Sequence, residues 1–420
     1  MINDKTKEPL AGMTLNELQD VVTALGMPRF TAKQLAQWIY GKRVNDFDQM
    51  LNISKANRQL LASRYCVGLY PPTSSVTSED GTVKYLFDVG SKHAVEAVYI
   101  PEDDRATLCI SSQKGCRMNC YFCMTGRQGF RGNLTANQII NQVLSVPQSD
   151  QLTNVVFMGM GEPLDNLDQV LNVISILTEP WGLAWSPKRV TVSTVGKKPE
   201  LKVLCEQTNV HIAVSVHNAD PDERASMMPI QKLYPIADVL DMLGQYDFAH
   251  QRRLSVEYIC WQWFNDDIQH AERLRELLPN EHVRVNLIRY HMIPGIEKLR
   301  TSSDERMTYF RDYLNSKGVT CTIRRSRGED VMAACGMLAG KVKDGAPIAA
   351  PAAKPAPTTP KPAPASAKPA KTGKTAAAAT AEAAKRPTRA ASTSKNRQSS
   401  RTAGTSAPKQ PRGKGGKRSR

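Results

Sequence analysis

The stretch Cys109-Ile-Ser-Ser-Gln-Lys-Gly-Cys116-Arg-Met-Asn-Cys120-Tyr-Phe-Cys123 decides how this chain is organised. Three of its cysteines follow the spacing C-x-x-x-C-x-x-C, and Cys109 lies seven residues upstream of the first of them. A loop this short can place three thiolates around one small metal centre, and thiolates select zinc or iron–sulfur clusters. A four-iron cluster held by three cysteines leaves one iron without a protein ligand. That iron can take a substrate, as catalytic zinc keeps a position for water.

A structural zinc site is the alternative interpretation of the same cysteines. Structural zinc takes four protein ligands, usually arranged as paired C-x2-C units. No histidine and no second cysteine pair follows the stretch nearby, so the ligand count favours the cluster. A disulfide between these cysteines is disfavoured as well, because nothing marks the chain as secreted.

The charge distribution separates the chain into two different parts. The 420 residues carry a formal net charge of +16, but residues 341–420 contain 19 Lys and Arg against two acidic residues. The first 340 residues contain 37 basic and 38 acidic residues and are therefore nearly neutral. The last segment is rich in Ala, Pro, Lys, Ser and Thr, which predicts a disordered basic tail. Such a tail could solubilise the chain or attract RNA phosphates without sequence preference.

Cysteine usage and hydropathy indicate the compartment. The chain has nine cysteines, an odd number with four of them clustered, which is typical of reduced thiols that serve metal binding and chemistry. The N-terminus is polar, and no run of about 18 apolar residues could cross a membrane. We therefore expect a soluble, cytoplasmic protein with no membrane partner.

Helix signals predict a small N-terminal module. Thr14-Leu-Asn-Glu17 and Thr31-Ala-Lys-Gln34 are capping boxes that each begin a helix, the second running to about Tyr40. A third helix follows Ser54. Residues 83–88 and 95–100 then predict a β-hairpin that turns near Gly90.

From residue 108 onward, strands alternate with helices. The predicted strands are 108–112, 154–159, 189–194, 211–216, 254–260 and 284–289. Helical stretches between them include 135–146, 167–177 and 271–278, and a late strand follows over 319–325. Repeated β–α units predict an α/β fold whose parallel sheet is closed or nearly closed into a barrel. In such barrels the chemistry lies at the carboxyl ends of the strands.

These patterns divide the chain into four predicted segments: an N-terminal helical domain over residues 1–70, a β-hairpin linker over 71–107, a core over 108–340 and the tail over 341–420.

The cysteine spacing after a first barrel strand resembles the signature of the radical S-adenosylmethionine (SAM) enzymes. The string from Cys109 to Cys116 and the string Cys123-Met-Thr-Gly-Arg-Gln-Gly-Phe130 resemble one branch of them, the RlmN/Cfr family of RNA adenine methyltransferases. The resemblance extends from about residue 14 to residue 340. It implies a partial (β/α)6, TIM-like barrel with an accessory domain that helps to seat folded RNA. It also implies a [4Fe–4S] cluster held by Cys116, Cys120 and Cys123.

Motifs at the predicted strand ends resemble the positions where the family binds SAM. The glycines of Gly159-Met-Gly161-Glu162-Pro163 would let a ligand approach the backbone, and Glu162 could accept a hydrogen bond from a ligand ammonium. The resemblance assigns further SAM contacts to Ser193, Ser215, Val216 and His217. Without the resemblance, these would be strand-end residues that satisfy the local backbone.

One position departs from the family pattern. In Tyr290-His291-Met-Ile-Pro294-Gly295, His291 stands where the family usually has an asparagine that contacts SAM. An imidazole can still form a hydrogen bond, so we expect His291 to contact SAM.

The resemblance also implies a mechanism for methylating an adenine carbon, which is not a nucleophile. Cys335 resembles the cysteine that one SAM methylates, and a second SAM then yields a radical that takes hydrogen from that methyl group. The resulting methylene radical adds to the base. Glu96 corresponds to the general base that removes a proton from the adduct. Cys109 corresponds to the cysteine that closes a disulfide with Cys335 and releases the product.

Taken singly, these residues would have ordinary interpretations. Cys109 and Cys335 would be small buried hydrophobic residues, and Glu96 would be a solvated carboxylate on a strand. Arg324, Arg325 and Arg327 could contact RNA phosphates or be solvated charges.

We therefore predict a monomeric methyltransferase that acts on carbon 2 of adenine 2503 in 23S rRNA, and on adenine 37 of some tRNAs, with two SAM per turnover. A low-potential electron donor would be a further partner. The target base must be unpaired or flipped to reach the site. One alternative keeps the mechanism but methylates carbon 8 of the same adenine. Another is a zinc-bearing RNA-binding protein in which the basic tail does the binding.

Overall fold

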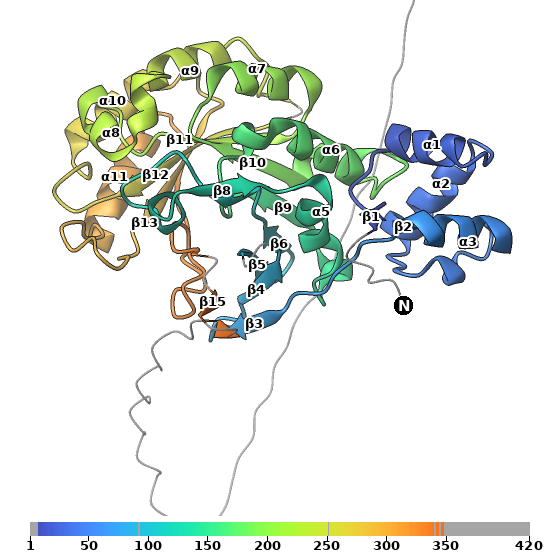
Figure 1. Ribbon diagram of the computed structural model, residues 1–420. Helices are drawn as coiled ribbons and strands as arrows, with labels where there is room; N and C mark the ends of the chain where they lie inside the picture. The colour runs from blue at the N-terminus through green and yellow to red at the C-terminus, as the bar shows by residue number, and fades with distance from the viewer. Residues whose placement is uncertain (1–6, 91–92, 251, 340–341, 344–345, 348–420) are drawn as a thin grey trace, which may run out of the picture. The chain divides into compact units, whose positions relative to one another are not determined.

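The computed structural model describes residues 7–90, 93–250, 252–339, 342–343 and 346–347 (Figure 1). Chain contacts divide the sequence into Met1–Pro355 and Ala356–Arg420, and the described residues all belong to the first unit. The predicted tail lies outside the described residues, apart from the antiparallel pair β15 (Val342–Lys343) and β16 (Ala346–Pro347). No helix of the described part is long and apolar enough to cross a membrane.

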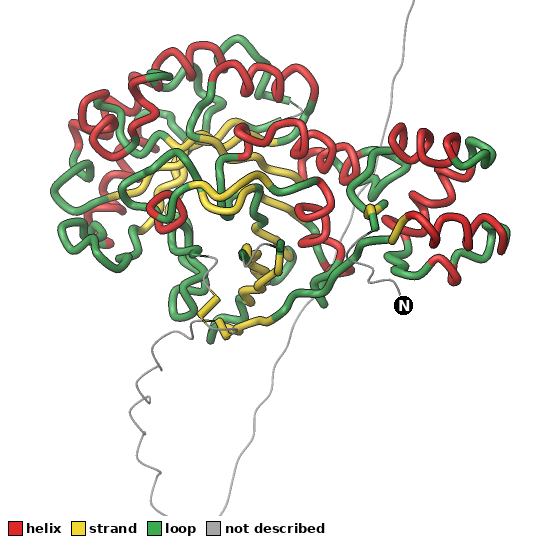
Figure 2. The backbone as a smooth tube through the Cα atoms, in the orientation of Figure 1, coloured by secondary structure: helices red, strands yellow, loops and turns green. Residues whose placement is uncertain are grey.

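A ten-stranded sheet forms the centre of the fold (Figure 2). Seven of its strands are parallel: β6 (Ala106–Cys109), β9 (Asn154–Phe157), β10 (Val190–Thr194), β11 (His211–Ser215), β12 (Leu254–Cys260), β13 (Arg284–Arg289) and β14 (Cys321–Ile323). Three antiparallel strands extend the β6 edge: β5 (Ala94–Pro101), β4 (Val83–Asp88) and β3 (Ser74–Thr77). Within the described residues, β14 and β3 are the two ends of the sheet, so the parallel strands form an open, partial barrel.

The predicted α/β fold with a parallel-rich sheet is confirmed. The late strand predicted over 319–325 is present as β14, and it pairs with β13 as the seventh parallel strand of the sheet. The strand β3 was not predicted, because Ser74-Ser-Val-Thr77 has only one strongly apolar residue. The first barrel strand also ends earlier than predicted, at Cys109 instead of residue 112.

Helices connect the parallel strands and lie outside the sheet (Figures 1 and 2). They are α5 (Ala136–Leu144), α6 (Leu167–Thr178), α7 (Lys198–Gln207), α8 (Pro221–Met227), α9 (Ile236–Leu243), α10 (Ile268–Leu277) and α11 (Asp304–Ser316). Parallel strands require such crossover connections, and the apolar face of each helix packs on the sheet.

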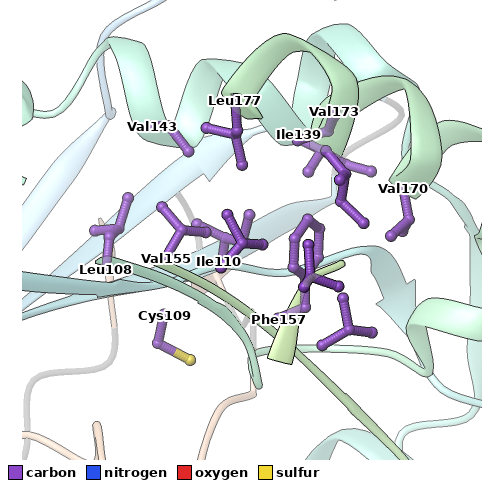
Figure 3. Packing of buried hydrophobic residues seen from close by; sticks show 14 of the residues in the cluster. Leu108, Cys109, Ile110, Ile139, Val143, Val155, Phe157, Val170, Val173 and Leu177 are labelled. Carbon is purple, nitrogen blue, oxygen red and sulfur yellow. The ribbon is translucent and has the colours of Figure 1, made fainter. Parts of the chain in front are cut away.

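Packing on β6 shows how the fold separates core from site. Leu108 and Ile110 point toward Val143 and Leu177 of the covering helices, and all four are buried (Figure 3). Cys109 points to the opposite face, because successive side chains of a strand alternate between its two faces.

The N-terminal module contains α1 (Leu15–Ala24), α2 (Thr31–Ala36) and α3 (Lys55–Arg64), with β1 (Glu8–Pro9) pairing parallel to β2 (Tyr65–Cys66). The predicted capping box of Thr14 and Glu17 and the start of α3 after Ser54 are confirmed.

The second predicted capping box is wrong. Thr31 is the first residue of α2, and Phe30 before it already has helical dihedral angles and forms no side-chain cap. The Thr31 amide instead donates to the Pro28 carbonyl at 2.9 Å, so the preceding turn leads directly into the helix. A single π-helical turn, Gln37–Gly41, continues the helix beyond Tyr40.

Asn137 on α5 connects the N-terminal module to the barrel. Its side-chain amide donates to the carbonyls of Ala11 at 2.9 Å and Gly68 at 2.8 Å. The backbones also approach each other closely, since a Cβ at Gly12 would lie 2.3 Å from the backbone nitrogen of Asn137. Only glycine fits there, and its φ of +99° is also one that glycine tolerates.

We predict that Asn137→Ala loosens the module without unfolding the barrel. The substitution leaves two carbonyls without their donor, which costs about 1–3 kcal/mol for each buried group. Amide hydrogen exchange over residues 7–70 should accelerate, while exchange in the parallel strands stays unchanged. Asn172→Ala is the matched control, since Asn172 reaches the module only through an exposed 3.5 Å contact with Glu17. Equal exchange in both variants would contradict the role of Asn137.

Candidate active site

The cysteine loop is closed by a short hairpin. Strands β7 (Gln113–Gly115) and β8 (Phe130–Asn133) pair antiparallel, and α4 (Met124–Arg127) follows the last cysteine. A Cβ at Gly115 would lie 1.9 Å from the Gly129 carbonyl oxygen, and the φ of Gly115 is +77°. The hairpin therefore closes only with glycine at this position.

Buried hydrogen bonds of Ser111 fix the start of this loop. The Ser111 amide donates to the Gln142 side-chain oxygen at 2.8 Å, and the Gln142 side-chain nitrogen donates back to the Ser111 carbonyl at 2.9 Å. The Ser111 hydroxyl donates to the Glu96 carbonyl at 2.6 Å and accepts from the Met160 amide at 2.8 Å. One fully buried serine thus joins β5, α5 and the turn after β9.

The three cysteines of the loop line one cavity of about 160 Å³. Cys116 and Cys120 are buried, and Cys123 is partly buried. Burial raises the pKa of Cys116 to about 12, and it also raises the pKa of Cys120 and of Cys123. Metal binding would release these protons and satisfy three buried sulfurs at once, so the residues fit a thiolate-bound centre.

The number of thiols in the loop suits a cluster with an open iron. Structural zinc takes four protein ligands, whereas the loop supplies three cysteines to this cavity.

The turn after β9 brings a carboxylate to the same cavity. At Gly161, with φ +104°, a Cβ would lie 2.6 Å from the Gln113 side chain, so the turn packs directly on the cysteine loop. The Glu162 carboxylate accepts from the amides of Val195 at 3.0 Å and Leu164 at 3.1 Å. Burial raises the pKa of Glu162 to about 7, so a cationic ligand group would stabilise its charged form.

The ends of β10 and β11 supply further polar groups. Ser193, Ser215 and His217 line the cavity of Glu162, whereas the Val216 amide donates to the Glu257 carbonyl at 3.1 Å. His217 has φ +58°, and its Nδ1 accepts from the Ile259 amide at 3.1 Å. Burial, aided by Arg224, lowers the pKa of His217 to about 3. The imidazole is therefore neutral, with Nε2–H as its donor.

Arg224 was not singled out from the sequence, yet it connects these strand ends. It is fully buried and donates to the carbonyls of Val195 and Ser215 at 3.1 Å and of Val216 at 3.0 Å. Its remaining bond goes to the side-chain oxygen of Gln231 at 2.6 Å. Burial lowers its pKa to about 10. An arginine on a short polar helix usually lies in solvent, so no local pattern indicated this role.

Cys335 lies where two cavities meet. It lines the cavity of the three loop cysteines and also a neighbouring cavity of about 300 Å³, which Cys109 lines as well. The Met124 amide donates to the Gly336 carbonyl at 2.8 Å, so the Cys335 segment is bound to the end of the cysteine loop. Burial, aided by Cys335, raises the pKa of Cys109 to about 12. All nine cysteines lie in the described residues, and each is a thiol.

His291 and Glu96 lie close to these cavities but not in the one that Glu162 lines. His291 lines the cavity of Cys109, where its Nδ1 is 3.2 Å from the Glu329 carboxylate and its Nε2 is 3.2 Å from the Ser326 hydroxyl. Glu96 lines a third cavity of about 200 Å³. Its carboxylate is 3.4 Å from the Lys84 ammonium and accepts from the Ala339 amide at 2.7 Å.

Arg324 forms an ion pair inside the barrel, although its side chain stays 36% exposed. Its guanidinium is 3.3 Å from the buried Glu257 carboxylate inside the barrel. Met158, Glu257 and Arg324 all line the cavity of the loop cysteines.

Comparisons with known proteins agree with this geometry. The family model described as the ribosomal RNA large subunit methyltransferase N-terminal domain matches residues 9–67, and that of the radical SAM superfamily matches residues 110–296. A probable dual-specificity RNA methyltransferase RlmN of Parabacteroides distasonis is 56% identical over 332 residues, which cover 79% of this chain and 96% of that protein. The chain belongs to the RlmN family of radical SAM RNA methyltransferases.

More distant relatives match over a similar share of this chain. The dual-specificity RNA methyltransferase RlmN of Syntrophotalea carbinolica is 39% identical over 81% of this chain and 92% of its own length. A crystal structure of a radical SAM methyltransferase from Sphaerobacter thermophilus superimposes with a TM-score of 0.74 at 35% identity. It covers 80% of this chain and all of that one, which confirms the radical SAM fold.

We predict that Glu162 makes the metal-free chain less stable as the pH rises from about 4.5 to about 7. In this range native Glu162, with its pKa raised to about 7, binds a proton that the unfolded chain does not bind. Stability falls with pH wherever the native state binds more protons. In urea unfolding between pH 5 and pH 8, the free energy of unfolding of Glu162→Gln should fall less with pH than that of wild type. Glu206→Gln, on the exposed side of α7, should leave this pH dependence unchanged. If the unfolding free energy depended on pH equally in wild type and Glu162→Gln, a raised pKa of native Glu162 would be contradicted.

Proposed function

We propose that this RlmN family member methylates carbon 2 of adenine 2503 in 23S rRNA and of adenine 37 in tRNAs, using two SAM per turnover. The observation that carries the proposal is the position of Cys335, which lines both the cavity of the three loop cysteines and the cavity of Cys109. A group carried on the Cys335 sulfur can therefore face either cavity.

The chain would bind both cofactors in the first cavity. Cys116, Cys120 and Cys123 would hold a [4Fe–4S] cluster, and the cluster with SAM would supply a 5′-deoxyadenosyl radical when both are bound. The buried Glu162 carboxylate would accept hydrogen bonds from the SAM ammonium. Further polar contacts would come from Ser193, Ser215 and His217.

Val216 and His291 are the less direct members of the proposed SAM site. Val216 would act through its backbone at the end of β11, since its side chain is buried in the core. His291 lines the neighbouring cavity and would need to turn away from Glu329 and Ser326 to reach SAM.

Cys335 would carry the methyl group, and Cys109 would release the product. The Cys335 thiol is exposed and can accept a methyl group, whereas Cys109 is buried on the facing strand. After transfer, the Cys109 thiolate attacks the Cys335 sulfur, and the carbon–sulfur bond breaks as the disulfide forms. The released carbon keeps the electron pair of that bond and takes up a proton to become the methyl group of the product. Both sulfurs are thereby oxidised, and an electron donor must return them to thiols before the next turnover.

Glu96 would be the general base that removes the proton from the methylated carbon of the adduct. Its carboxylate lies 3.4 Å from the Lys84 ammonium and accepts a hydrogen bond from the Ala339 amide at 2.7 Å. Because the Ala339 amide occupies one carboxylate oxygen, the segment around Ala339 must shift before Glu96 can reach a base.

RNA would reach the site as an unpaired or flipped base, because an adenine inside a helix is inaccessible. The N-terminal module would help to seat the RNA, and the basic tail would add attraction to phosphates. Two RNA substrates are supported by the relatives, whose names describe dual-specificity RNA methyltransferases. The cytoplasmic location and the monomeric state stay predictions.

Anaerobically reconstituted protein, SAM, a reductant and protein-free 23S rRNA or tRNA test the proposal, with mass spectrometry of the digested RNA. Wild type should produce 2-methyladenosine, and Cys335→Ala should reduce the yield on the order of 10³-fold or more. Cys205→Ala is the matched control, since Cys205 is a buried thiol on α7 outside these cavities. A product of 8-methyladenosine would move the chain to the carbon-8 alternative. No product from a protein with an intact cluster would overturn the substrate assignment.

Cys109→Ala should stop the reaction at a different step. Without the Cys109 thiol, the bond between the Cys335 sulfur and the modified base cannot be exchanged for a disulfide. We expect a covalent RNA–protein adduct that a denaturing gel resolves and that nuclease digestion collapses. Cys109→Ala combined with Cys335→Ala should form no adduct. Release of normal product by Cys109→Ala alone would exclude the disulfide step.

A further inference from the structure

The parallel strands enclose a large cavity at their amino ends, opposite the cysteine loop. Its volume is about 830 Å³, which lies in the range of small-molecule sites. Polar side chains from all seven parallel strands line it, beside the apolar Val156, Met158 and Ile212: Thr107, Asn154, Thr191, His211, Ser255, Asn286 and Thr322. Barrel interiors are usually filled at such positions by packed, branched apolar side chains. The polar lining therefore calls for a polar occupant.

Cationic side chains surround the mouth of this cavity. They come from the starts of four strands, β6, β10, β12 and β13, or from the loops before them: Arg105, Lys188, Arg252, Arg253 and Arg284. Two acidic residues lie beside them, within the described part of the chain: Glu281 on the rim and Glu102, which pairs with Arg105. Because the strands are parallel, all these loops meet at the same edge of the sheet, which concentrates their charge.

Three of these cations have neither a carboxylate nor a carbonyl partner within the described residues. Arg105 pairs with Glu102, and Arg252 donates to the carbonyls of Cys205 at 2.8 Å and Thr208 at 3.1 Å. In contrast, Lys188, Arg253 and Arg284 form no ion pair in the part of the chain that the structure describes. These three extend from β10, β12 and β13 or their preceding loops toward one space.

The positive charges of these side chains lower the pKa values of the ionisable groups among them. Burial, together with Arg253, Lys188 and Arg284, lowers the pKa of His211 to about 4. Burial and the nearby Arg284 and Arg105 likewise lower the pKa of Arg253. An anion placed here would relieve the repulsion among these cations.

The ion pair of Glu257 and Arg324 lies at the inner end of this cavity. The Glu257 carboxylate accepts from the Ser255 hydroxyl at 3.0 Å and from the Asn286 side-chain amide at 2.8 Å, and it lies 3.3 Å from Arg324. Glu257 and Arg324 line both this cavity and the cavity of the loop cysteines. The cavity also adjoins that of Cys109, with which it shares Arg105, Thr107, Val156, Met158 and Arg324.

We infer that this cavity binds a small anion with two or more phosphate groups, such as a nucleoside di- or triphosphate. Guanidinium groups match phosphate oxygens in geometry, and three unpaired cations suit more than one phosphate charge. The hydroxyl, amide and imidazole groups deeper in the cavity can bind the rest of such a ligand. Because the cations encircle a concavity rather than follow a ridge, they favour a compact anion over an RNA backbone.

Isothermal calorimetry on the reconstituted full chain tests this inference, with inorganic tripolyphosphate and ATP as separate probes. Wild type should show one saturable site above the salt-sensitive background that the basic tail contributes. Arg253→Gln combined with Arg284→Gln should weaken that site about tenfold or more, because two charge-assisted contacts are lost. Lys202→Gln combined with Lys317→Gln removes the same charge from exposed positions on or just after α7 and α11 and should bind as wild type does.

Two further readouts separate a specific site from general attraction. Tripolyphosphate should raise the melting temperature of wild type but not of the Arg253→Gln, Arg284→Gln variant, whose own stability should not fall because repulsion is removed. The ligand should also raise the pKa of His211, which NMR can resolve among only seven histidines.

Equal binding by all three proteins would overturn the inference and assign the anions to the tail and surface. Binding that depends on Arg253 and Arg284 but is seen only with an RNA oligonucleotide would overturn the assignment to a small anion.

Discussion

The hydrogen bonds of Ser111 are the constraint on which the active-site geometry depends. This fully buried residue receives or donates four bonds, and they join β5 through the Glu96 carbonyl, α5 through Gln142 and the turn after β9 through Met160. Buried polar groups must keep their partners, so these bonds cannot be exchanged for water. Cys109 lies two residues before Ser111 and the first loop cysteine lies five residues after it. The position of both therefore follows from this single anchored point.

The carboxyl ends of β10 and β11, which share a cavity with the cysteine loop, are held by buried charges. The Val195 amide donates to Glu162, and the Val195 carbonyl accepts from Arg224, so two opposite charges hold the end of β10. Burial moves both pKa values toward neutrality, to about 7 for Glu162 and about 10 for Arg224. Neither charge is paired directly with the other, and backbone groups stabilise each. Burying two charges in this way costs stability in the empty site. A ligand that brings a charge of opposite sign to one of them offsets that cost.

Local patterns predicted the parts of the structure that local chemistry controls. The cysteine spacing, the strand–helix alternation and the Thr14 capping box depend on neighbouring residues, and the structure confirms the alternation and this cap. The Thr31 cap failed because a turn at Pro28 already supplied the helix start. Arg224 and the cations at the strand starts could not be found, since each resembles a solvated charge until the fold places it. Bringing Cys109 and Cys335 together required the family resemblance, because over 200 residues separate them.

We propose that the loop cysteines and Glu162 form one site for a cluster that binds SAM. Electron paramagnetic resonance of the reduced, reconstituted chain, recorded before and after SAM addition, tests this site most directly. We expect a [4Fe–4S] signal that changes when SAM is added. We also expect a Glu162→Gln variant to keep the cluster but to need about tenfold more SAM, because one charge-assisted contact is lost. A cluster signal that SAM leaves unchanged, or a full cluster in Cys123→Ala, would contradict a shared site.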